Sequence, residues 1–111
     1  MSFTPSFSVA QTGLSPNLVI LTDNSSGSDP LILSRKITFT NSAGSTVVPS
    51  GTSTSYVAWP LATNPISVNL LTSDAALSIR VDWLNVSGVS IYDLTQEYAL
   101  EQYKKHHFIY L

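Results

Sequence analysis

The stretch from Ala76 to Tyr98 carries the clearest pattern of hydrophobic and polar positions in the chain. Apolar and polar side chains alternate at its start, the apolar set being Leu77, Ile79, Val81 and Trp83 and the polar set Ser78, Arg80 and Asp82. This period of two is typical of a strand with one buried and one solvated face. Turn residues follow at Asn85 to Gly88, and an extended pattern resumes at Val89. The segment therefore predicts a β-hairpin that needs a second sheet over its apolar face, because an isolated hairpin is marginal in water.

Shorter extended segments, separated by turn residues and prolines, precede this hairpin. The pattern predicts strands from Phe3 to Thr12, Leu18 to Leu21, Ser34 to Asn41, Thr46 to Val48, Tyr56 to Trp59 and Ile66 to Leu70. Leu18 to Leu21 are apolar on both faces, which favours a central strand. Strands at such short intervals indicate an all-β sandwich of about seven strands, which we place at residues 1–98.

Composition narrows the classes of function. The 111 residues suit a single domain, and 43% hydrophobic against 11% charged residues indicate a folded, low-charge protein. With a net charge of −2 the chain lacks the basic surface that attracts nucleic acid. It has no cysteine, and we find neither a signal peptide nor an apolar run long enough to span a membrane. We therefore expect a chain that is soluble as made, with no nucleic-acid or membrane partner.

The character of the sequence changes near its end. Residues 99–111 contain good helix formers, so we predict a short C-terminal helical or extended docking segment. Leu100, Tyr103, His107 and Tyr110 fall on one face at helical spacing, and the last residues are bulky and apolar. Exposed apolar surface of this kind marks binding sites. We predict that the segment docks on another subunit, or that the natural chain continues past Leu111. For docking, the predicted interface residues are Leu100, Tyr103, His107, Phe108, Ile109, Tyr110 and Leu111.

Two stretches resemble a known family. Leu18 to Phe39, LVILTDNSSGSDPLILSRKITF, resembles a region of polycystic-kidney-disease-type (PKD) immunoglobulin-like domains, and Ala76 to Gly88, ALSIRVDWLNVSG, resembles their penultimate strand and turn. The chain departs from the family in having Ile37 where a Trp is usual and Thr40 to Gly44 in place of a Gly-Asp-Gly turn. The resemblance implies an immunoglobulin-like β-sandwich.

The whole pattern is also similar to small immunoglobulin-like virion proteins of tailed bacteriophages, including crAss-like phages of gut Bacteroidetes. This similarity implies a non-enzymatic structural protein of a neck, connector ring or tail. It further implies a homo-oligomeric ring, other virion proteins as partners, and a location in the virion after synthesis in the host cytoplasm. It transfers no catalytic residue.

Several histidine, aspartate and serine residues are candidates for chemistry, with ordinary structural roles as the alternative. His106 and His107 are adjacent, so they do not face the same way on a helix and make a poor metal pair. Three carboxylates at loop ends, Asp23, Asp29 and Asp82, are candidates for a calcium site, with turn capping as the alternative. No G-x-S-x-G motif is present, so a serine hydrolase is not favoured. We predict no enzyme activity, cofactor or metal.

Aromatic residues offer a second class of function, surface adhesion or carbohydrate binding. Tyr56 and Trp59 are a possible ligand platform, because Trp59 precedes Pro60 in a Ser/Thr-rich region and is expected to be exposed. Trp83 shares its parity with Ile79 and Val81 and is therefore expected in the core.

Overall fold

The computed structural model describes residues 2–14, 17–49, 55–70 and 76–100 of the 111-residue chain. These residues form eight β-strands. They are β1 (Phe7–Leu14), β2 (Asn17–Asp23), β3 (Ser34–Asn41), β4 (Thr46–Val47), β5 (Val57–Trp59), β6 (Ile66–Leu70), β7 (Ala76–Leu84) and β8 (Ser90–Ala99). No helix occurs among the described residues, and none of them forms a segment of the kind that crosses a membrane as a helix.

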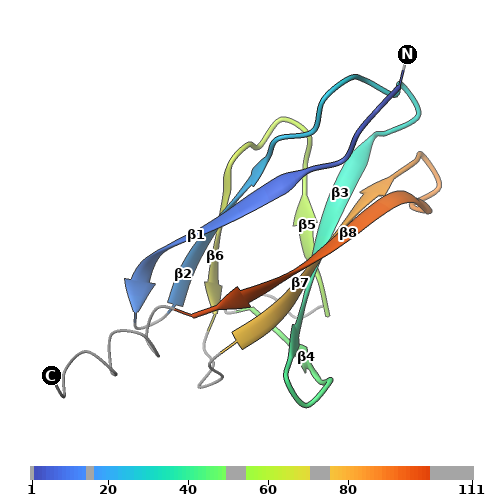
Figure 1. Cartoon of the computed structure of the whole chain (residues 1–111). Coiled ribbons are helices and arrows are strands. Elements are labelled where there is room, and N and C mark those ends of the chain that lie inside the picture. Colours follow the sequence, from blue (N-terminus) through green and yellow to red (C-terminus); the bar gives the residue numbers. More distant parts are fainter. Residues whose placement is uncertain (1, 15–16, 50–54, 71–75, 101–111) are drawn as a thin grey trace, which may run out of the picture.

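The strands pair into two antiparallel sheets. One sheet has the order β1-β2-β6, and the other has the order β4-β3-β7-β8 with β5 also paired to β3. Figure 1 shows the two groups of strands as separate layers. The predicted all-β class and sandwich-like arrangement are confirmed.

Apolar side chains from both sheets fill the space between the layers. The buried cluster consists of Phe7, Val19, Leu21, Ile32, Ile37, Phe39, Trp59, Val68, Leu70, Leu77, Ile79, Val81, Trp83 and Leu100. The alternation read from the sequence is confirmed in β7, where Leu77, Ile79, Val81 and Trp83 are almost fully buried. The second sheet is what makes this burial possible, since a sheet can hide its apolar face only against another element.

The central position predicted for Leu18 to Leu21 is also confirmed. These residues lie in β2, which pairs with β1 on one side and β6 on the other. Val19 and Leu21 point into the core and are fully buried, whereas Leu18 and Ile20 are only partly covered.

The N-terminal stretch begins pairing later than predicted. The first strand starts at Phe7 instead of Phe3, although the Phe3 ring still packs against Trp83 and Tyr92 at centroid distances of 6.0 and 4.8 Å. Thr4 bridges to Ser26 in the loop between β2 and β3. Gly27 makes this approach possible, because its φ is +77° and a Cβ there would lie 1.8 Å from the carbonyl oxygen of Ser2.

The boundary predicted at residue 99 falls at the end of the last strand and inside the core. Ala99 is the last residue of β8, and Leu100 is fully buried in the core of its own chain. Leu100 is therefore covered without a second subunit, which corrects its prediction as an interface residue. The other predicted interface residues, Tyr103, His107, Phe108, Ile109, Tyr110 and Leu111, lie outside the described residues, as do His106 and most of the predicted docking segment.

Candidate functional site

The pairing of β3 with β5 separates two sets of side chains onto opposite faces of the larger sheet. Arg35 is opposite Trp59, and Lys36 is opposite Ala58. Because successive side chains in a strand point to opposite faces, Arg35 and Trp59 face the interior while Lys36 and Ala58 face outward. Burial agrees, since Arg35 and Trp59 are buried and Ala58 is exposed.

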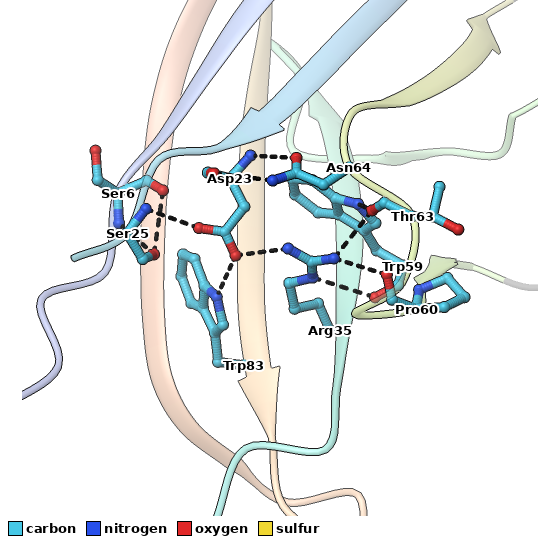
Figure 2. Close-up of polar contacts among 9 residues, drawn as sticks. All are labelled: Ser6, Asp23, Ser25, Arg35, Trp59, Pro60, Thr63, Asn64 and Trp83. Atoms are coloured by element: carbon cyan, nitrogen blue, oxygen red, sulfur yellow. Dashed lines mark hydrogen bonds and ion pairs between the residues drawn. The ribbon is translucent and has the colours of Figure 1, made fainter. Parts of the chain in front are cut away.

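On the inner face, Arg35 is the centre of a polar cluster drawn in Figure 2. Its Nη1 lies 2.6 Å from Oδ2 of Asp23, and only 3% of the arginine side chain is exposed. The other guanidinium nitrogens donate to the carbonyl oxygens of Trp59, Pro60 and Thr63 at 3.3, 2.6 and 3.0 Å. The guanidinium carbon also lies 4.2 Å from the centroid of the Trp59 ring. The planar fork of arginine suits this set of acceptors, which a lysine cannot match.

Asp23, at the end of β2, is the anion of this cluster. Trp83 Nε1 donates to its Oδ2 at 3.0 Å, and the backbone N–H of Ser25 donates to its Oδ1 at 2.9 Å. Burial raises the pKa of the Asp23 carboxyl, but the hydrogen bonds from Ser25, Trp83 and Arg35 outweigh burial and lower the pKa below its ordinary value. The carboxylate therefore stays ionised opposite the guanidinium.

The three aspartates considered for a cation site are engaged separately. Asp23 pairs with Arg35, Asp29 accepts a hydrogen bond from the Tyr92 hydroxyl at 2.8 Å, and Asp82 pairs with Arg80 at 3.0 Å. No group of three or more histidine, cysteine or acidic side chains gathers in the described part of the chain. The interpretation of these aspartates as one calcium site is wrong, because each has a protein donor of its own.

The outer face of the same strands carries a hollow with a volume of about 310 Å³. It is lined by Leu33, Ser34, Arg35, Lys36, Tyr56, Ala58, Trp59, Pro60, Leu61 and Leu84. Three large apolar or aromatic side chains at this hollow are exposed: Leu33 by 54%, Leu61 by 46% and Tyr56 by 40%. Lys36 places its Nζ 5.2 Å from the centroid of the Tyr56 ring. Exposed apolar surface in a concave site is typical of a binding site.

The inner cluster fixes the wall of this hollow. Pro60 and Leu61 belong to the segment that follows β5, and Arg35 holds the carbonyl groups on both sides of Leu61, those of Pro60 and Thr63. Trp59 Nε1 also donates to the Thr63 carbonyl at 2.6 Å. Asn64 exchanges two hydrogen bonds with the backbone of Asp23, at 2.9 and 3.1 Å, and the next peptide bond, Asn64-Pro65, is cis. These hydrogen bonds fix the backbone of the segment that carries Leu61, on one side of the hollow.

The predicted platform of Tyr56 and Trp59 is divided between the two faces. The expected exposure of Trp59 is wrong, since its side chain is fully buried under Arg35. Tyr56 is exposed at the hollow, beside Lys36. A strand of three residues is too short for its alternation to be noticed, yet Trp59 shares its parity with the partly buried Val57. This shared parity is the sequence feature that could have placed Trp59 on the inner face.

Sequence reasoning missed Arg35, Lys36, Leu33 and Leu61. Arg35 shares its parity with Ile37 and Phe39, so the strand pattern itself places a charge on the inner face of β3. Neither leucine has such a signal, because both lie in segments between strands. No known protein family and no curated protein matches this chain.

Proposed function

We propose that this protein is a non-enzymatic assembly module, a β-sandwich subunit that works by binding other protein subunits. The observation that carries the proposal is the hollow on the outer face of β3 and β5. It combines exposed Leu33, Leu61 and Tyr56 with a wall that Arg35 holds in place. An exposed apolar surface that is rigid before binding is the feature that protein interfaces use at their centres.

The wider setting that we propose is the virion of a tailed phage, as a component of a neck, connector ring or tail. In this setting the module is an immunoglobulin-like domain of the PKD type, repeated in a homo-oligomeric ring and in contact with other virion proteins. Support comes from the resemblance of Leu18 to Phe39 and of Ala76 to Gly88, together with the sandwich-like arrangement of the strands. The segment from Tyr103 to Leu111 supplies the contacts between neighbours in the ring.

Crosslinking from the hollow tests the binding role. A photoreactive phenylalanine analogue replaces Leu61 in the full chain, which is produced together with the products of its neighbouring genes. We expect a crosslink to one subunit, identified by mass spectrometry. The matched control places the same analogue at Val48, which is also about half exposed but does not line the hollow. Equal crosslinking from both positions, or none from position 61, would contradict the proposal.

The ring is tested separately, by light scattering and negative-stain microscopy of the purified full chain. We expect a closed multimer that the double substitution Phe108→Ser and Tyr110→Ser breaks into smaller species. A chain that remains monomeric at every concentration rules out the homo-oligomeric form of the proposal.

Carbohydrate binding is the second candidate function, and Tyr56 is the observation that favours it. Its exposed ring lies at a hollow beside Lys36, and aromatic faces stack on the apolar faces of sugars. The platform has lost its second ring, because Trp59 is buried. A glycan array read with wild type and Tyr56→Ala separates the two functions, since only a sugar-binding module shows a signal that this substitution removes.

A further inference from the structure

Lys36 differs from the other basic side chains of the described residues. Arg35 pairs with Asp23, and Arg80 pairs with Asp82 and Asp93. Within the same part of the chain, Lys36 has no carboxylate at ion-pair distance, and its ammonium group lies over the Tyr56 ring. Asp82 lies opposite Lys36 in the register of β3 and β7, but its carboxylate pairs with Arg80 and accepts a hydrogen bond from Ser90. Among the described residues Lys36 therefore stands on the wall of the apolar hollow without an ion pair.

The position of this cation specifies the charge of an occupant. Lys36 is only partly exposed, and apolar groups line much of the hollow around it. An ion pair formed there is screened less by water and salt than a pair on an open surface. A second cation brought to the same place is repelled. The complementary group is therefore a carboxylate next to an apolar side chain.

The extent of the apolar surface indicates how large the occupant is. Leu33 and Leu61 remain about half exposed at the hollow, and Tyr56, which also lines it, is 40% exposed. A small organic acid seated beside Lys36 leaves this surface in water. A peptide segment crosses it, with one side chain in the hollow and others along the leucines.

We infer that the hollow binds an acidic peptide segment of a different protein, with an apolar side chain seated against Leu33 and Leu61 and a neighbouring carboxylate paired with Lys36. This inference rests on the proposed function and adds the chemistry of the partner. It also distinguishes this surface from the basic segment around Lys104 and Lys105, whose charge does not complement Lys36.

Selection from a library of random peptides tests the inference, with the full wild-type chain as the target. We expect the enriched peptides to combine an apolar residue with Asp or Glu a few positions away. One such peptide is then titrated by calorimetry. Lys36→Gln is expected to weaken its binding about five- to tenfold and Lys36→Glu more than tenfold. Ala58→Trp is expected to abolish binding, because the new side chain fills the hollow lined by Ala58.

Two controls make the result specific. Thr95→Glu lowers the net charge by one unit, as Lys36→Gln does, at an exposed residue of β8 that does not line the hollow, and it is expected to leave the affinity unchanged. A peptide whose acidic residue is replaced by Lys is expected to bind the Lys36→Glu variant more tightly than it binds the wild-type protein.

The outcomes separate this inference from the proposed function. Enriched peptides without an acidic residue, or peptides that bind Lys36→Glu as tightly as wild type, overturn the inference. A crosslink from position 61 to a second copy of this chain also overturns it, while leaving the assembly role in place. The proposed function itself fails if position 61 crosslinks to no subunit, or no more than position 48 does.

Discussion

Each face of the β3–β5 pair carries one exception to the usual distribution of polarity in a folded protein. The inner face holds a salt bridge between Arg35 and Asp23, both largely excluded from water. The outer face, which water reaches, exposes Leu33 and Leu61. Buried charge and exposed apolar surface are each uncommon enough to need an explanation, and here they share one stretch of chain.

The difference is that one face is chemically complete and the other is not. No side-chain nitrogen or oxygen buried in the described residues lacks a hydrogen-bond partner. The inner cluster therefore has no unused group to offer, and its role is to position the segment after β5. The outer hollow retains surface that would be more stable out of water. Adjacent residues thus have separate roles, Arg35 in folding and Lys36 in binding.

The largest expected effect is the loss of Arg35. Arg35→Ala leaves the Asp23 carboxylate without its cation and removes the donors to three backbone carbonyls. Removing one partner of a buried ion pair costs about 3–5 kcal/mol, so we expect a drop of that size in the free energy of unfolding, measured with urea. The control is Lys36→Ala on the same strand, which we expect to stay within about 0.5 kcal/mol of wild type. Equal losses for both variants would show that the two faces do not differ in this way.

A smaller effect is expected from Asp23, and it depends on pH. Asp23→Asn keeps the shape of the side chain but removes its charge, and we expect a loss of about 2 kcal/mol at neutral pH. The pKa of this carboxyl is lowered below its ordinary value of 3.8 in the folded chain. Its contribution to stability is therefore complete above that ordinary value and disappears as the pH falls through the lowered folded pKa.

The measurement is the urea midpoint of wild type and Asp23→Asn from neutral pH down into the acid range. We expect the gap between the two proteins to narrow only below a pH of about 4. A gap that stays constant through the acid range shows that ionisation of Asp23 does not contribute to stability.

The sequence predicted a strand and its buried face well where the alternation of apolar and polar residues was long, and poorly where it was short. The nine residues of β7 repeat their alternation often enough to identify both faces, and the hairpin with β8 followed from the turn residues between them. The class of fold and the core position of Trp83 were therefore accessible. β5 has three residues, and its neighbouring proline and Ser/Thr-rich context favoured the wrong face for Trp59.

The hollow was not accessible from the sequence, for a physical reason. Leu33, Leu61 and Tyr56 line it, and these residues come from three separate segments of the chain. Only the register between β3 and β5 brings them together. Similarly, the place of Asp23 opposite Arg35 depends on contact between residues of different sheets, which the periodicity of a single strand does not encode.

An effect of intermediate size is expected from Asn64, which ties the segment carrying Leu61 to the backbone of Asp23. Its side chain forms two hydrogen bonds with the backbone of Asp23 from an exposed position. We expect Asn64→Ala to lower the free energy of unfolding by about 1 kcal/mol and to weaken binding at the hollow, since the segment carrying Leu61 is held less firmly. Thr95→Ala on β8 is the control and is expected to change neither quantity. Normal binding by Asn64→Ala would show that Arg35 alone fixes the wall.

The smallest effect on stability is expected at Leu61, where the effect on binding is nevertheless large. Leu61 is nearly half exposed, so Leu61→Ser removes little buried apolar surface, and the urea midpoint is expected to stay close to that of wild type. Crosslinking to the partner from position 56 is expected to fall sharply in the same variant, because the occupant loses one wall of the hollow. Val48→Ser changes an equally exposed side chain outside the hollow and is expected to alter neither measurement. If Leu61→Ser unfolds the chain, Leu61 stabilises the fold and is not mainly a binding residue. If the substitution leaves crosslinking intact, the exposed leucines are not the surface on which the partner lies.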